Sequence, residues 1–180
     1  MPATPNDILT FWTNAGPQKW YAAKPAFDEI IRLKFEPTHH VAARGGYDDW
    51  AVTPQGALAL LIVLDQFPRN LYRNSGHAFA TDPKARAFAR MAADKGWHAE
   101  VEPPMRQFML LPFEHSEDLA DQDYGLALAE ALGDAEMIKW HRVHRDVIVR
   151  FGRFPHRNPA LGRTTTAEEQ AFLDEGGFAG

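Results

Sequence analysis

The sequence predicts an all-α protein, and two observations favour that fold class. Residues that commonly begin and end helices recur along the whole chain, with Thr, Ser or Asp at the starts and Gly at the stops. No stretch alternates apolar and polar residues with enrichment in Val, Ile and Thr, and no Asn-Gly or Asp-Gly turn joins two apolar runs. We therefore expect about eight helices and less than about 5% strand.

Helix starts and stops divide the chain into these elements. Proline at the first helical position has no N–H to lose there, so a Thr or Asp just before it is a strong start signal. The predicted starts are Thr4, Thr53, Asp82, Ser116, Asp134 and Thr166, the last with Glu169 as a capping box, and the predicted stops are Gly45-Gly46, Gly96, Gly133 and Gly152. The expected helices span 5–13, 25–44 (interrupted at Pro37), 54–67, 83–95, 104–111, 117–132, 135–151 and 167–174.

The composition predicts one soluble domain over residues 1–180 and excludes several kinds of chemistry. The chain has 180 residues, of which 45% are hydrophobic and none is Cys, so disulfides, thiolate zinc sites, iron–sulfur clusters and thiol catalysis are excluded. The longest apolar run, Ala57 to Leu64, is far shorter than the roughly 20 residues that span a bilayer. The first residues lack the basic and apolar regions of a signal peptide, so we expect a cytoplasmic protein with no membrane partner.

The net charge of −5 is unevenly distributed. Residues 100–136 contain ten Asp and Glu against Arg106, whereas residues 139–163 contain Lys139 and six Arg against Asp146. One interpretation is that these blocks face each other as neighbouring helices joined by screened surface ion pairs. The other is that part of the basic block binds an anionic ligand. Nucleic acid is not expected, because the rest of the surface would repel phosphate and no nucleic-acid motif is present.

Asp65 is expected to be buried, because apolar residues surround the axis of the helix that begins after Thr53. A carboxylate there needs a cation or a proton. Arg69 is a candidate partner, although Pro68 is expected to end the helix before a regular pair four residues apart can form. A structural ion pair and a ligand-binding role both remain open for Asp65.

The helix at 135–151 places two histidines on its apolar side. His144 lies within the apolar arc, and His141 lies at its border. Inward histidines are usually hydrogen-bonded core residues, but two of them, with Glu114, His115 and His156 elsewhere in the chain, also fit a proton-transfer site. Histidines and carboxylates could also hold a transition metal, but His-x-x-His is a weak signal and the His-Glu-x-x-His pattern is absent, so we assign no metal site.

Two similar segments follow apolar helices. The first is Phe67-Pro68-Arg69-Asn70, with Arg73 beyond it, and the second is Phe154-Pro155-His156-Arg157-Asn158, with Arg163 beyond it. In each, proline is expected to turn the preceding Phe away from helical geometry. Arginine donates two parallel N–H bonds to a carboxylate or phosphate, so these arginines, with Arg153, either bind an anion or tie down carbonyls and carboxylates of the chain itself.

The sequence also resembles the bacterial domain-of-unknown-function 924 family. The strings that carry the resemblance are Ile8 to Trp12, Leu64 to Asn70, Phe79 to Asp82, Leu111 to Asp118, Phe151 to Asn158 and Leu161-Gly162-Arg163. They extend over nearly the whole chain. The resemblance implies an all-helical, tetratricopeptide-like array of helical hairpins, and it implies no particular activity or cofactor. From the residues alone, no clean 34-residue repeat is visible.

Three functions are compatible with these observations. In the first, a pocket binds a small anion and Glu114, His115 or His144 moves protons, so the protein is an enzyme or a binding protein. The second is a tetratricopeptide-like scaffold for a peptide or a partner's carboxylate terminus, and the third is a purely structural ion network. The expected ligand-binding residues are Asp65, Arg69, Asn70, Arg153, His156, Arg157 and Arg163. We expect the two Phe-Pro segments to converge on one cavity.

Overall fold

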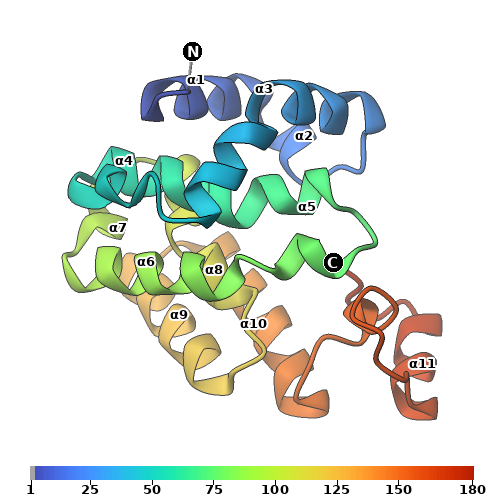
Figure 1. The fold of residues 1–180 in the computed structure, drawn as a ribbon. Helices are drawn as coiled ribbons and strands as arrows, with labels where there is room; N and C mark the ends of the chain where they lie inside the picture. Colours follow the sequence, from blue (N-terminus) through green and yellow to red (C-terminus); the bar gives the residue numbers. More distant parts are fainter. Residues whose placement is uncertain (1–2) are drawn as a thin grey trace. The chain divides into compact units, whose positions relative to one another are not determined.

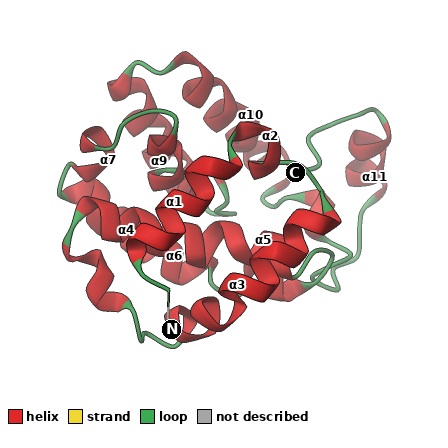
Figure 2. Cartoon of the chain, turned by 90° about the horizontal axis from the view of Figure 1, so that it is seen from above, coloured by secondary structure: helices red, strands yellow, loops and turns green. Residues whose placement is uncertain are grey.

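The computed structural model describes residues 3–180, and every regular element in them is helical (Figure 2). The predicted fold class is therefore confirmed, with more and shorter helices than the eight expected. The α-helices are α1 (Pro5–Ala15), α2 (Pro17–Trp20), α3 (Pro25–Ala43), α4 (Pro54–Leu61), α5 (Phe67–Leu71), α6 (Asp82–Asp94), α7 (Trp97–Glu100), α8 (Leu111–Glu114), α9 (Leu119–Leu132), α10 (Ala135–Phe151) and α11 (Ala167–Asp174). Shorter turns are η1 (Asp48–Val52), η2 (Ile62–Gln66), η3 (Gly76–Phe79), η4 (Met105–Met109) and η5 (Pro155–Arg157). Among residues 3–180, no helix is both long and apolar enough to cross a membrane.

The chain divides into two compact units. The first contains residues up to Arg73 and His77–Pro112, and the second contains Asn74–Gly76 and Phe113–Gly180. Helices α1 to α7 belong to the first unit, and α9 to α11 belong to the second (Figure 1). A single domain over residues 1–180 stays a prediction.

Most of the predicted caps are present. Four predicted caps accept a hydrogen bond from a backbone N–H at the start of their helix. They are Thr4, Thr53, Asp134 and Thr166. Two predictions were wrong. Asp118 caps α9, and Ser116 instead accepts a hydrogen bond from the Asp118 N–H. Asp82 is the first residue of α6 rather than its cap, and its carboxylate is bonded to Arg69.

Pro37 and Pro68, which are expected from the sequence to interrupt or end helices, both lie in continuous helical backbone. Helix α3 continues through Pro37, which lies on its exposed side. Leu33, four residues earlier, is 75% exposed, so the carbonyl that loses its N–H partner lies on the solvent side. At Pro68 the chain also stays helical, and Phe67 has φ −58° and ψ −40°. The expectation that proline would turn Phe67 out of helical geometry was therefore wrong.

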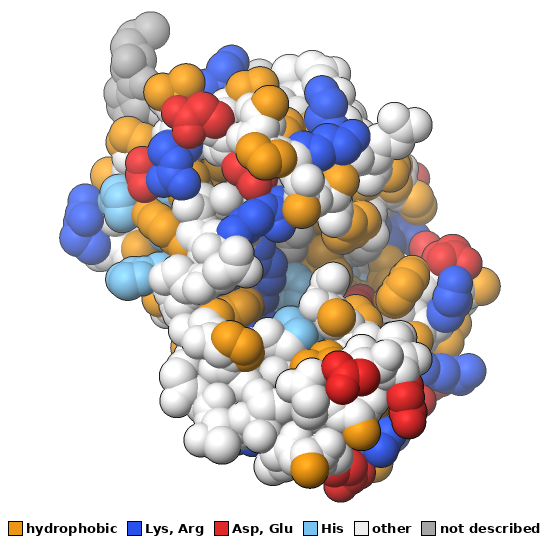
Figure 3. Space-filling model, turned by 90° about the vertical axis from the view of Figure 1, so that its right-hand side faces the viewer, with side chains coloured by type: hydrophobic (Ala, Val, Ile, Leu, Met, Phe, Trp, Pro, Cys, Tyr) orange, Lys and Arg blue, Asp and Glu red, His pale blue; other side chains and the backbone are white. Residues whose placement is uncertain are grey.

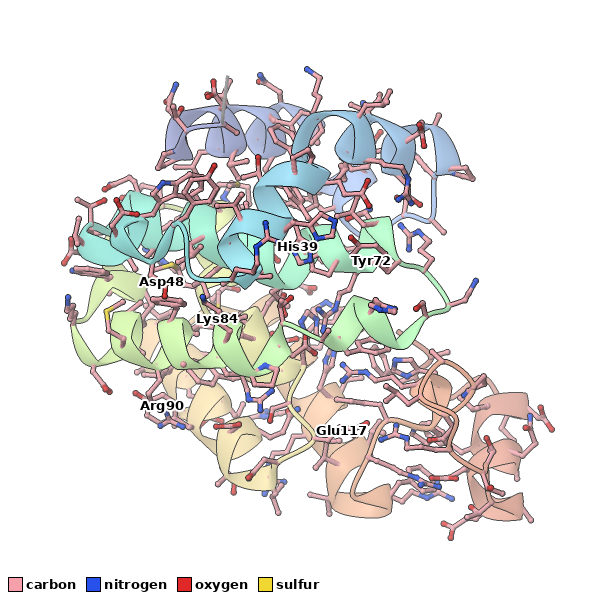
Figure 4. The ribbon with its side chains drawn as sticks, in the orientation of Figure 1. His39, Asp48, Tyr72, Lys84, Arg90 and Glu117 are labelled. Carbon is pink, nitrogen blue, oxygen red and sulfur yellow. The ribbon has the colours of Figure 1, made fainter. Side chains whose placement is uncertain are left out.

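A π-helical turn explains how the chain accepts Pro68. Residues Ile62–Gln66 form this wider turn between α4 and α5. The carbonyl of Leu64, which the proline cannot bond, accepts the Thr81 hydroxyl at 2.5 Å. The neighbouring Val63 carbonyl lies 3.0 Å from His39 Nδ1, which must donate because a carbonyl only accepts. Figure 4 shows His39 on α3 beside Tyr72, which follows α5.

Each unit has its own apolar core. In the first unit, Trp12 and Phe67 are fully buried and their ring centroids lie 5.6 Å apart. In the second unit, Val147, Ile148 and Phe154 are buried, and partly buried aromatic rings pack against them. Those rings belong to Phe151, Phe172 and Phe178. The second core therefore holds α10, η5 and the residues after α11 together.

Candidate functional site

Asp65 is buried and paired with an arginine, as predicted. Its side chain is 2% exposed, and its Oδ1 lies 3.2 Å from Arg69 Nη1. Because the π-helical turn keeps the backbone helical through Pro68, the pair four residues apart forms after all. Arg69 also donates to both carboxylate oxygens of Asp82, at 3.0 Å each. Burial opposes the charge of Arg69, but Asp65 and then Asp82 raise its pKa above the usual value. This arrangement is a complete ion network that joins α5 to α6.

Asn70 is engaged in a second network of the first unit. Its amide donates to Asp28 Oδ1 at 2.8 Å, and Arg73 Nε donates to Asp28 Oδ2 at 2.5 Å. The end of α5 is thereby fixed to the start of α3. Asp28, which the sequence analysis did not select, is the common acceptor.

The acidic and basic blocks of the second unit pair across two helices. Arg142 on α10 lies 2.8 Å from Glu130 on α9, and Arg145 lies 2.5 Å from Asp123. The interpretation that neighbouring helices face each other is therefore confirmed for these residues. Such exposed pairs contribute on the order of 0–1 kcal/mol each. Figure 3 shows basic side chains lying against acidic ones on the face drawn there.

Glu114 lies between the two inward histidines of α10. Its Oε1 lies 3.2 Å from His141 Nε2, and its Oε2 lies 3.2 Å from His144 Nδ1. The exposed fractions of Glu114, His141 and His144 are 3%, 0% and 8%. One buried carboxylate thus contacts two buried imidazoles, and we call these three residues the Glu114 cluster.

The backbone determines which nitrogen of His144 carries the proton. Its Nδ1 lies 2.8 Å from the Trp140 carbonyl, which only accepts hydrogen bonds. Nδ1 must therefore be the protonated nitrogen, and it also faces the Glu114 carboxylate. In the neutral ring the lone pair is then on Nε2, so His144 is oriented as a proton acceptor at that atom.

Burial favours the neutral form of both imidazoles of the Glu114 cluster. Burial and, to a smaller extent, the nearby His115 lower the pKa of His144 to about 3. Burial likewise lowers the pKa of His141 to about 4, again with a contribution from His115. A neutral imidazole keeps a lone pair for a ligand, and an anion bound beside it would raise its pKa toward the working pH.

Helix α9 supports this cluster through Gly125 and Gln122. A Cβ atom at Gly125 would lie 2.8 Å from His141 Cε1 and 2.7 Å from Phe113 Cβ, so glycine permits the close approach of α9. The Gln122 amide donates to the carbonyls of Glu114 and Ser116 at 2.7 and 2.8 Å. Gln122 thereby fixes the backbone that carries the central carboxylate.

Two of the predicted ligand-binding arginines form bidentate pairs with carboxylates of the second unit. Arg153 donates to both oxygens of Glu169 at 2.6 and 2.9 Å, and these bonds, with the Thr166 N–H, lower the pKa of Glu169 to about 2. Arg163 donates to both oxygens of Glu117 at 2.6 and 2.9 Å. Both arginines therefore already have a planar carboxylate in the position that an anionic ligand would take.

Arg157 is placed differently. It is 6% exposed, its Nη1 donates to the His115 carbonyl at 2.9 Å, and its guanidinium lies 4.4 Å from the centroid of the Phe154 ring. The His115 and His144 rings lie 6.2 Å apart, and Arg157 also helps to lower the pKa of His144. Arg157 and His115 therefore border the Glu114 cluster. The His156 ring also lies near Phe154, with ring centroids 5.6 Å apart.

The structure brings together the candidates of the second unit and gives the others separate partners. The second unit contains Glu114, His115, His144, Arg153, His156, Arg157 and Arg163, and the first unit contains Asp65, Arg69 and Asn70. One cavity shared by both Phe-Pro segments stays a prediction. The sequence analysis selected His141 only as a border residue and missed Gln122 and Gly125. A glycine or glutamine inside a helix looks the same in the sequence whether it supports a functional site or only packs in the core.

Within residues 3–180, no group of three or more His, Asp or Glu side chains is arranged to hold a metal ion. The first unit has an open surface depression of about 510 Å³ beside α3, lined by Glu36, Pro37, His40, Val41 and Arg44. Elsewhere in that unit, Lys84 of α6 lies 2.8 Å from Asp48 of η1 (Figure 4). The Glu114 cluster is the stronger candidate site, because its titratable groups are buried and oriented.

The comparisons with known proteins agree with the all-α fold and give no activity. A family model described as "Bacterial protein of unknown function (DUF924)" matches residues 8–177. The chain is similar to the solved structure of a protein of unknown function from Agrobacterium tumefaciens, with 43% identity and a TM-score of 0.91. That alignment covers 95% of this chain and 97% of the Agrobacterium chain. No curated protein gives a significant match.

Proposed function

The chain belongs to the DUF924 family of bacterial proteins of unknown function, and we propose that its second unit binds a small anionic ligand from which His144 accepts a proton. The observation that carries this proposal is the Glu114 cluster. A buried carboxylate and a backbone carbonyl together orient a neutral imidazole with its lone pair on Nε2. An oriented, neutral imidazole can act as a general base once an anion bound beside it raises its pKa toward the working pH.

Arg157 is the residue best placed to bind the anion. Its guanidinium is held by the His115 carbonyl and by the face of Phe154, so little side-chain freedom is lost when a ligand binds. Arg153 and Arg163 already form bidentate pairs with Glu169 and Glu117. The proposed roles are therefore anion binding by Arg157, with His115 and His156 beside it, and proton transfer by His144.

A screen of thermal stability tests this proposal. Phosphate, sulfate, acetate, benzoate and nucleotides are added separately, and a ligand at about 100 times its Kd should stabilise the protein by roughly 2.7 kcal/mol. For a chain of this size, that corresponds to a rise in Tm of about 5–10 °C. The rise should be lost in Arg157→Ala.

Arg142→Ala is the matched control, because Arg142 is on the same unit but is exposed and paired with Glu130. It should keep the full rise in Tm. A rise that survives Arg157→Ala would place the anion elsewhere, and the absence of any rise with all of these anions would refute the proposal.

The second candidate function is a scaffold for a peptide or a partner's carboxylate terminus. The observation that favours it is the helical hairpin of α9 and α10, which only Gly133 and Asp134 connect. Successive hairpins of this kind would make the tetratricopeptide-like array that the family resemblance implies. Binding of peptides without any response to small anions would support the scaffold.

A further inference from the structure

The chain after α11 turns back toward the candidate site. The C-terminal end of the chain runs from α11 toward α10 (Figure 1). The ring centroid of Phe178 lies 4.4 Å from that of His144, 5.5 Å from that of His156 and 6.2 Å from that of Phe154. We call the space between His144, Phe154 and His156 the aromatic slot, and Phe178 occupies it.

Two glycines shape this return. Gly176 has φ +80°, which favours glycine, and a Cβ at Gly177 would lie 2.5 Å from the ring atoms of Phe172. The segment therefore folds closely over Phe172 before Phe178 enters the aromatic slot. The segment forms no helix, since α11 ends at Asp174 before it. A short segment of this kind separates from its slot at a low free-energy cost compared with a packed helix.

Phe178 covers the proton acceptor. His144 is 8% exposed with Phe178 against it. A ligand that reaches His144 through the aromatic slot must first displace the Phe178 ring. The walls of the slot are two imidazoles and one phenyl ring, and such walls bind a flat aromatic group through stacked or edge-to-face contacts.

A cation borders the aromatic slot. The Arg157 guanidinium lies 4.4 Å from the Phe154 ring centroid, and His144 is neutral, so an anionic group beside the slot meets a positive charge. We propose that the ligand is an aromatic anion whose ring replaces Phe178 in the aromatic slot while its carboxylate or phosphate binds Arg157. This inference rests on the proposed function and assigns a ligand class to the same site.

Competition between Phe178 and the ligand gives the test. Calorimetric titrations of benzoate and acetate, and of phenyl phosphate and inorganic phosphate, are carried out on the wild type and on Phe178→Ala. If the slot is open in about a tenth of wild-type molecules, Phe178→Ala should bind benzoate and phenyl phosphate about tenfold more tightly. The affinities for acetate and inorganic phosphate should change little, because these anions leave the slot empty.

Phe151→Ala is the matched control. Phe151 belongs to the same apolar cluster and its ring centroid lies 5.0 Å from that of Phe172, so its loss disturbs packing without removing the ring that occupies the slot. It should keep the wild-type affinities. Phe178→Trp, which keeps a ring at this position, should bind benzoate no more tightly than the wild type.

The outcomes separate this inference from the proposed function. Equal affinities of the wild type and Phe178→Ala for benzoate, with acetate or phosphate binding that depends on Arg157, would overturn the aromatic ligand class alone. If none of the four anions binds to either protein, the proposed function fails and this inference fails with it.

Discussion

Replacing Arg69 by methionine should lower the free energy of unfolding by about 3–5 kcal/mol, because it leaves two buried carboxylates without their shared arginine. The side chains of Asp65 and Asp82 are 2% and 7% exposed, and Arg69 lies within 3.2 Å of both. Methionine keeps much of the volume of the arginine stem, so the loss of stability reports mainly the missing positive charge. Urea unfolding at pH 7 measures the free energy of unfolding of the wild type and the variant.

Two further variants make this result specific. Arg142→Met removes an exposed arginine paired with Glu130 and should change the stability by less than about 0.5 kcal/mol. Asp65→Ala should cost less than Arg69→Met, since Arg69 keeps both bonds to Asp82. An Arg69→Met protein as stable as Arg142→Met would show that the network contributes nothing to folding.

Acid should destabilise the protein well above the pH at which carboxylates titrate. The pKa values of His141 and His144 are lowered to about 4 and about 3 in the folded state, against 6.5 for an ordinary histidine. Below pH 6.5 these two histidines therefore bind protons in the unfolded chain but not in the folded chain. The free energy of unfolding falls as the pH falls. Between pH 6.5 and 4.5 we expect a loss of up to about 2 kcal/mol for each of these two histidines.

Urea unfolding at several pH values between 7 and 4.5 measures this loss, and His144→Gln is the variant to compare. It should remove about half of the dependence that the two histidines cause. His39 and His98 contribute in the same direction, because burial lowers the pKa of each, and they remain unchanged in this variant. Equal slopes for the wild type and His144→Gln would mean that His144 titrates normally in the folded protein.

The fold class and the burial of individual polar residues could be predicted from the sequence. Helical periodicity alone indicates that Asp65 and His144 face inward, and the structure confirms both. The capping pattern at Thr166 and Glu169 is likewise local, so it needs no knowledge of the rest of the chain. Each of these features is determined by residues only a few positions away in the sequence.

The helix through Pro68 shows why the rest could not be predicted. Proline normally ends a helix by leaving a carbonyl without its partner, but here Thr81, 17 residues away from Leu64, donates to that carbonyl. A contact between residues far apart in the sequence therefore allows the helix to continue where proline would normally end it. The same holds for Glu117 and Glu169, which are ordinary helix-start carboxylates in the sequence and become the partners of Arg163 and Arg153 only in three dimensions.

The protonation state and tautomer of His144 test most directly whether the Glu114 cluster holds a neutral imidazole with its lone pair on Nε2. Nitrogen NMR of the histidine side chains between pH 8 and 3 distinguishes the two neutral tautomers from the charged ring. At pH 7 the ring of His144 should be neutral, with the proton on Nδ1 and the lone pair on Nε2, and it should stay so until the pH approaches its pKa of about 3. A charged His144 at pH 7, in an ion pair with Glu114, or a neutral ring with its proton on Nε2, would contradict this assignment.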